Sequence, residues 1–143
     1  MPRERFSENH TFLPKRAFLS FEEIEKVVRS CMSLGLEKVR ITGGEPLLRK
    51  DLPKLIEMLS ALGIEIALTT NASLLKKYAK DLHSAGLTRV TVSLDALDPE
   101  LHRTMSDSNI SVESILEGID EAIHVGLSPV KINCVVQKGV NEE

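Results

Sequence analysis

Hydrophobic residues recur every three or four positions in four stretches of the chain, and each stretch predicts an amphipathic helix. They cover residues 21–31, 52–62, 75–82 and 112–123. Ser20 and Glu23 form the pattern of a capping box at the start of the first stretch, and Asp51 is placed to cap the second. Apolar and polar residues alternate at every second position in four shorter segments, which predicts strands over 38–42, 64–70, 89–94 and 130–136. Strands that alternate with helices indicate a parallel sheet with right-handed crossovers.

A glycine in a similar short sequence follows each predicted helix. These glycines are Gly35, Gly63, Gly86 and Gly126. Glycine adopts the left-handed conformation that commonly ends a helix, so the four positions indicate repeated helix-strand units. A chain of 143 residues is long enough for one core, and we expect residues 1–143 to form a single domain. Residues 1–19 show no clear periodicity and are predicted to be an extended loop.

The predicted strands alternate strictly, so one face of the sheet is apolar and the other polar. The polar face would carry Arg40, Thr42, Glu65, Ala67, Thr69, Thr91, Ser93, Lys131 and Asn133. A closed parallel barrel fills its interior with bulky branched residues, so this pattern favours an incomplete barrel whose lumen holds a ligand. Two cations on separate strands, Arg40 and Lys131, together with nearby hydroxyls suit a phosphorylated ligand. An open sheet with one solvated face remains the alternative.

The residues that follow the predicted strands are small and polar. Ligand sites in parallel α/β folds lie at these carboxyl ends. After the first strand, Gly43 and Gly44 would let a ligand approach bare backbone, and Glu45 can accept hydrogen bonds from an ammonium group. Asp95 follows the third strand and is expected either to bind a ligand amine or to cap the next segment.

Composition narrows the class of protein. The net charge is −3, from 18 basic and 21 acidic residues, and 42% of residues are hydrophobic. This balance argues against a disordered chain and against a nucleic-acid-coating protein. No apolar run approaches the length of a membrane helix, so we expect a cytoplasmic protein with neither nucleic acid nor membrane as a partner. Cys31 and Cys134 are too few and too far apart for a metal motif, and two buried thiols are the simplest interpretation.

Several segments of the sequence together resemble those of radical S-adenosylmethionine enzymes. They are the run 38–49 with its Gly-Gly-Glu-Pro, the strand ends 69–71 and 93–95, and the segment 129–136 with Gly139 and Asn141. Within that superfamily the chain is most similar to the GTP 3′,8-cyclases that begin molybdenum cofactor (molybdopterin) biosynthesis, over essentially its whole length. The resemblance implies an α/β fold, an incomplete (βα)6 TIM-type partial barrel, in which this chain forms parallel strands two to five with their flanking helices.

The resemblance also implies a site. The positions of Gly44, Glu45 and Ser93 contact S-adenosylmethionine in such enzymes, and those of Arg40, Thr69 and Lys131 bind GTP. A [4Fe-4S] cluster there reduces S-adenosylmethionine to a 5′-deoxyadenosyl radical, which abstracts the ribose 3′ hydrogen of GTP. The product is (8S)-3′,8-cyclo-7,8-dihydroguanosine 5′-triphosphate, and the enzyme is a lyase. An electron donor protein and a homodimer of the full-length enzyme are further expectations.

The chain departs from the family pattern in its cluster ligands. The family's C-x3-C-x2-C motif runs directly into Met-Pro, and this chain begins with Met1-Pro2. We therefore expect an internal fragment without the cluster motif or the C-terminal domain, inactive on its own. Ala72 also stands where most relatives have glycine. The alternatives are another radical S-adenosylmethionine enzyme of the peptide-maturing type, against which Arg40 and Lys131 count, and a non-catalytic nucleotide-binding relic. Such a relic would pair or aggregate through unpaired strand edges.

Overall fold

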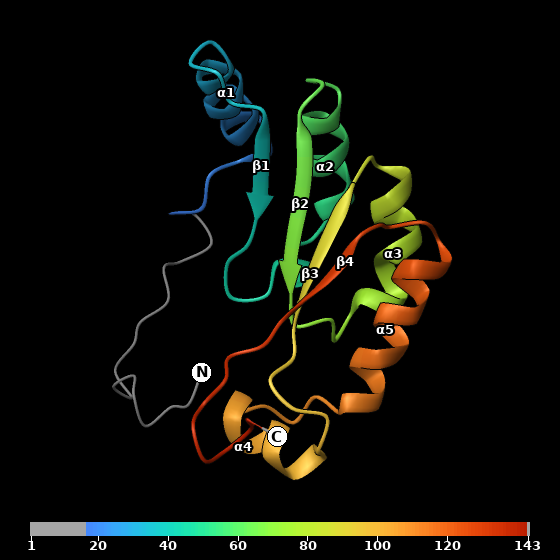
Figure 1. Cartoon of the computed structure of the whole chain (residues 1–143). Helices are drawn as coiled ribbons and strands as arrows, with labels where there is room; N and C mark the ends of the chain where they lie inside the picture. The colour runs from blue at the N-terminus through green and yellow to red at the C-terminus, as the bar shows by residue number, and fades with distance from the viewer. Residues whose placement is uncertain (1–16, 143) are drawn as a thin grey trace.

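A four-stranded parallel sheet forms the centre of the computed structural model, which describes residues 17–142. The strands are β1 (Lys38–Ile41), β2 (Glu65–Thr70), β3 (Arg89–Ser93) and β4 (Val130–Asn133). They lie in the order β1-β2-β3-β4, so each strand pairs in parallel with the next one along the chain (Figure 1). All four predicted strands are present, and β4 ends at Asn133, three residues before its predicted end. Most of the predicted loop over residues 1–19 lies outside the described residues.

Helices connect the strands. They are α1 (Phe21–Met32), α2 (Leu52–Ser60), α3 (Leu75–Ser84), α4 (Pro99–Ser106) and α5 (Val112–His124). Four of them match the predicted helical stretches, whereas α4 and a short 3-10 helix, Pro46–Leu48, were not predicted. The start of α4 does carry a recognisable signal, because Asp98 accepts a hydrogen bond from the Leu101 N–H and Pro99 occupies the first turn.

The two predicted helix caps have different outcomes. At the start of α1, the Ser20 hydroxyl accepts from the Glu23 N–H at 3.1 Å, and the Ser20 N–H donates to Glu23 Oε2 at 2.7 Å. This capping box is confirmed. The cap by Asp51 is wrong, since its side chain makes no capping hydrogen bond to α2. Asp51 has a left-handed backbone with φ of 58°, whereas a side-chain cap requires the extended conformation.

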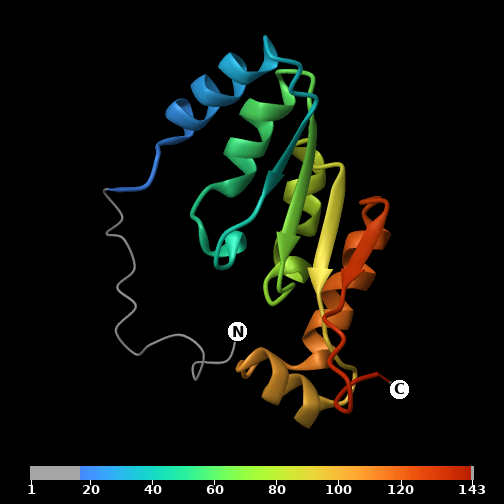
Figure 2. The ribbon, with the colours of Figure 1, turned by 60° about the vertical axis from the view of Figure 1, so that its left-hand side comes forward.

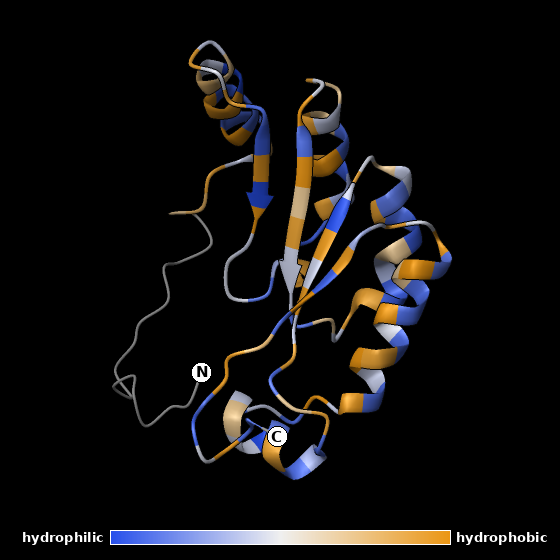
Figure 3. Cartoon of the chain, viewed as in Figure 1, coloured by the Kyte–Doolittle hydropathy of each residue, from blue (hydrophilic) through white to orange (hydrophobic). Residues whose placement is uncertain are grey.

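The hydrophobic core lies between the sheet and the helices. Ile56 and Leu59 of α2 and Leu82 of α3 are fully buried, as are Ile66 of β2 and Val90 of β3. Figures 1 and 2 show α2, α3 and α5 along the same face of the sheet. The strand alternation appears in Figure 3 as bands of hydrophobic and hydrophilic residues along β1 and β3. The polar side chains therefore lie on the opposite face, as the sequence predicted.

The apolar face of β4 is less covered than predicted. Ile132 is 50% exposed, and Cys134 just beyond the strand is also exposed. β4 is an edge strand of the described sheet, and both residues line a groove of about 990 Å³ with parts of α4 and α5. The interpretation of two buried thiols is wrong, since Cys31 is only half-buried in α1.

Across residues 17–142, no helix combines the length and the apolar character that crossing a membrane requires.

Candidate functional site

The strand register brings the predicted ligand residues together on the polar face. Arg40 of β1 is paired with Ala67 of β2, and one step further along, Thr69 of β2 is paired with Thr91 of β3. Thr91 is in turn paired with Lys131 of β4. Side chains that are in register on parallel strands point to the same face. The three residues expected to bind a phosphorylated ligand thus lie on three different strands of one surface.

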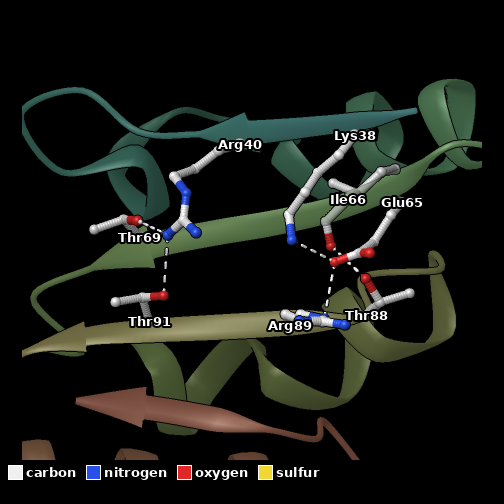
Figure 4. A network of polar contacts seen from close by, with 8 residues as sticks. All are labelled: Lys38, Arg40, Glu65, Ile66, Thr69, Thr88, Arg89 and Thr91. Atoms are coloured by element: carbon white, nitrogen blue, oxygen red, sulfur yellow. Dashed lines mark hydrogen bonds and ion pairs between the residues drawn. The ribbon is translucent and has the colours of Figure 1, made fainter. Parts of the chain in front are cut away.

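Arg40 reaches across the sheet from its edge strand. Its Nη1 donates to Thr69 Oγ1 at 3.1 Å and to Thr91 Oγ1 at 3.0 Å (Figure 4). Lys131 is exposed on the same face, opposite Thr91. The structure therefore joins Arg40 to Thr69 directly and places Lys131 one strand beyond the contact. The hydroxyls fix a guanidinium over the sheet, where it can meet an anionic ligand.

A second cluster of charges at the amino ends of the strands was missed by the sequence analysis. Glu65 Oε1 forms ion pairs with Lys38 Nζ at 2.7 Å and with Arg89 Nε at 2.8 Å (Figure 4). The signal was available, because Lys38 lies two residues before Arg40 and Arg89 two before Thr91. The polar face therefore carries four cations and one carboxylate, and that carboxylate pairs with the two cations at the amino ends of the strands.

The ion pairs of Glu65 make the stability of the fold depend on pH. The hydrogen bond from Lys38 lowers the pKa of Glu65, the charges of Arg89 and Lys131 lower it further, and desolvation opposes them. A carboxyl whose pKa is lowered by folding stabilises the fold at neutral pH. That contribution is lost as the pH falls through the folded-state pKa.

Replacing Glu65 by glutamine is expected to reduce the acid sensitivity of the fold. The variant should be less stable than the parent at pH 7, and the difference should shrink at an acidic pH, as Glu65 becomes protonated in the folded state. Urea denaturation at the two pH values measures it. Glu37→Gln is the control, since Glu37 is exposed and none of the ion pairs among residues 17–142 includes it. Equal differences at both pH values for Glu65→Gln would contradict the pKa assignment.

Glu45 ties the loop after β1 to the carboxyl end of β2. Its Oε1 accepts from the Leu47 N–H at 3.0 Å and from Thr70 Oγ1 at 2.8 Å, and its Oε2 accepts from the Asn71 N–H at 2.8 Å. Thr70 is itself 2% exposed and accepts from the Ala72 N–H. A carboxylate offers about four lone pairs, so Glu45 retains capacity for an ammonium donor.

The glycines beside Glu45 leave open space. A Cβ built on Gly43 or Gly44 meets no other atom within 4 Å. Ser93 is half-buried at the end of β3, where it is paired with Asn133. Gly44, Glu45 and Ser93 therefore all lie at the carboxyl edge of the sheet, where parallel α/β folds bind ligands.

Asp95 has a local role that the sequence did not predict. Its Oδ1 accepts from the Val135 N–H at 2.9 Å, and its carbonyl oxygen accepts from Asn141 Nδ2 at 2.7 Å. Of the two roles expected for Asp95, the cap of the next segment is wrong, since Asp98 caps α4, whereas binding of a ligand amine stays a prediction. Asp95 instead holds the chain after β4 against the end of β3.

Within residues 17–142, no group of three or more His, Cys, Asp or Glu side chains could hold a metal ion. The described residues therefore do not fit an iron-sulfur cluster, which needs several thiolates.

The fold and the site define an α/β domain of partial-barrel type, with a cationic face and polar strand ends. Comparison with known proteins specifies the family. The model of the Radical SAM superfamily matches residues 5–143, and the chain belongs to this superfamily. A crystal structure of an archaeal TYW1 has the same fold, with a TM-score of 0.60 and 20% identity over 85% of this chain and 45% of that one.

Curated relatives are more similar in sequence. The chain is 52% identical to the GTP 3′,8-cyclase of Staphylococcus carnosus over 145 residues, which cover 100% of this chain and 42% of that protein. It is 49% identical to the GTP 3′,8-cyclase of Acidothermus cellulolyticus over 144 residues, or 99% of this chain and 40% of that protein. The chain thus spans about two fifths of the length of these relatives.

Proposed function

We propose that this chain supplies the GTP-binding and S-adenosylmethionine-binding strands of a GTP 3′,8-cyclase, a radical S-adenosylmethionine lyase of molybdenum cofactor biosynthesis. The observation that carries the proposal is the guanidinium of Arg40, which is bonded to Thr69 and Thr91 on a polar face that also presents Lys131. A triphosphate needs several cationic donors on one surface, and this face provides them. The relatives named GTP 3′,8-cyclase support the choice of nucleotide.

The cofactor side of the proposal rests on the carboxyl edge of the sheet. Glu45 would accept a hydrogen bond from the amino group of S-adenosylmethionine, the open backbone at Gly44 would lie against its methionyl end, and Ser93 would face the same cofactor. When reduced by a [4Fe-4S] cluster, S-adenosylmethionine supplies the group that removes a hydrogen atom from the substrate ribose. The chain's own residues position the two ligands and exclude water.

The remaining parts of the proposal follow from this chemistry. The cluster would be held by cysteines other than Cys31 and Cys134, and an electron donor protein would reduce it. GTP is a charged nucleotide that does not cross membranes unaided, which favours a cytoplasmic location. We also propose that residues 1–143 belong to one radical S-adenosylmethionine domain, and that the complete enzyme is a homodimer.

Substituting Gly44 by alanine is expected to weaken S-adenosylmethionine binding without affecting folding. The added methyl group meets no protein atom, so the free energy of unfolding should change by less than about 0.5 kcal/mol. The same methyl would occupy the space that the cofactor needs. Equilibrium binding of S-adenosylmethionine and urea denaturation test the two parts, and undiminished affinity would contradict the assignment of Gly44.

A chimera tests the function as a whole. In the Staphylococcus carnosus cyclase, the segment that aligns with this chain is replaced by residues 1–143, giving a full-length enzyme whose cluster ligands come from the relative. After anaerobic cluster loading, we expect GTP-dependent formation of 5′-deoxyadenosine and of the cyclised nucleotide. A folded, cluster-loaded chimera that cleaves S-adenosylmethionine but leaves GTP unchanged would contradict the cyclase and favour another radical S-adenosylmethionine reaction.

A further inference from the structure

Thr91 lies at the centre of the polar face, and it is not among the residues that the family resemblance assigns to a ligand. In the strand register it is paired with Thr69 on one side and with Lys131 on the other. Both of these residues are proposed to bind GTP. Thr91 is half-buried, and its hydroxyl is joined to the third proposed GTP residue, Arg40. It therefore touches or borders every member of the proposed nucleotide site.

The path of the Arg40 side chain depends on the residues below it. Arg40 begins on β1, yet its guanidinium is bonded to side chains of β2 and β3. Its register partner on β2 is Ala67, whose small side chain leaves room for Arg40 to pass over the strand. Figure 4 shows the end of the Arg40 side chain between Thr69 and Thr91. Two hydroxyls on two different strands then hold the end of this long side chain.

The hydrogen bonds also determine which donors of Arg40 remain available. A terminal guanidinium nitrogen carries two hydrogens, and Nη1 uses both of them on Thr69 and Thr91. Nη2 and Nε retain three N–H groups, and none of the hydrogen bonds among residues 17–142 uses them. These N–H groups form the edge with which arginine binds an oxyanion through two parallel bonds.

We propose that Thr91 is a positioning residue, whose hydroxyl fixes the Arg40 guanidinium over the sheet so that its free edge faces the phosphates of the nucleotide. This inference rests on the proposed function. A flexible arginine loses rotamer freedom when it binds a ligand, and a guanidinium held in advance loses less of it. Thr91 raises the affinity for GTP in this way, acting through Arg40.

The test uses the chimera defined above. Thr91→Val keeps the shape of the side chain and suits a strand, so it should fold. We expect it to raise the Kd for GTP about five- to tenfold, the effect of one lost hydrogen bond, and to leave the Kd for S-adenosylmethionine unchanged. Thr91→Ser, which retains the hydroxyl, should restore GTP binding to nearly the parent value.

The matched control is Thr88→Val, one residue before β3. The Thr88 hydroxyl donates to the Ile66 carbonyl oxygen at 2.6 Å, so the same substitution removes a structural hydrogen bond there. This variant should have a lower Tm with an unchanged Kd for GTP. If Thr91→Val lowers the Tm but also leaves the Kd for GTP unchanged, Thr91 has a structural role only and the proposal is wrong.

The double variant Arg40→Ala/Thr91→Val identifies the route of the effect. If Thr91 acts through Arg40, the double variant binds GTP no more weakly than Arg40→Ala alone. If the two losses multiply instead, Thr91 contacts the nucleotide itself and the positioning role is wrong. Failure of the underlying function has a different signature, since Arg40→Ala would then bind GTP as tightly as the parent chimera.

Discussion

Replacing Arg40 by alanine in the chimera is expected to weaken GTP binding by about 1.5 to 3 kcal/mol, the range for hydrogen bonds to charged groups. This corresponds to a roughly 10- to 150-fold rise in the Kd, which titration calorimetry without substrate turnover measures directly. The reason is that two hydroxyls hold the Arg40 guanidinium in place and leave its other N–H groups available to the ligand. Among residues 17–142, no other cation of the polar face is held in this way. S-adenosylmethionine should bind as before.

Arg89→Ala is the matched control for this prediction. Arg89 lies on the same polar face of the sheet as Arg40. Its guanidinium, however, is paired with Glu65 at the amino ends of the strands. We expect its effect on the Kd for GTP to be at most about threefold, because a paired charge contributes little to the surrounding potential. Equal losses for Arg40→Ala and Arg89→Ala would indicate a diffuse electrostatic effect in place of a defined site.

Replacing Gly86 by alanine is expected to destabilise the fold by about 2 to 4 kcal/mol, through backbone strain and overpacking together. Gly86 ends the turn after α3 with φ of +98°, a conformation that alanine adopts at a cost. A Cβ at this position would also lie 2.8 Å from the Ser60 Cβ at the end of α2. Urea denaturation of the chain, followed by circular dichroism, measures the change.

Two further variants separate the causes. Gly63 also has a positive φ, of +76°, but a Cβ there meets nothing within 4 Å, so Gly63→Ala should cost only about 1 kcal/mol. In a Ser60→Gly background, where the clashing atoms are absent, Gly86→Ala should cost no more than Gly63→Ala. A large loss in that background would show that contact with Ser60 is not the reason.

The regular elements of the fold were predictable because their signals are local. Each of α1, α2, α3 and α5 buries one side, and the spacing of its apolar residues is visible in the sequence. Helix α4 was missed because it has only eight residues and one buried side chain, His102. Its periodic signal is too short to separate from a loop.

Features that depend on backbone conformation or on covering elements were harder to predict. Asp51 is a good capping residue by type, but its backbone is left-handed and its side chain makes no capping hydrogen bond to α2. Ile132 follows the apolar alternation correctly, yet it is half exposed because β4 is an edge strand. Residue type and periodicity give the face on which a side chain lies, but not what covers it.

The candidate site was predictable in outline. Alternation placed Arg40, Thr69 and Lys131 on one face, and the structure confirms that placement. Their roles came from the family resemblance and remain proposals. The bond between Glu45 and Thr70 joins residues 25 positions apart, so it required the three-dimensional arrangement of the strand ends.

The most direct test of the central claim is a crystal structure of the chimera with GTP and S-adenosylmethionine bound. The account predicts the triphosphate on the polar face of the sheet, with oxygen atoms within hydrogen-bonding distance of Arg40 and Lys131. It also predicts the amino group of S-adenosylmethionine at Glu45. GTP bound on the helical side of the sheet, or beside Lys38 and Arg89 at the amino ends of the strands, would contradict it.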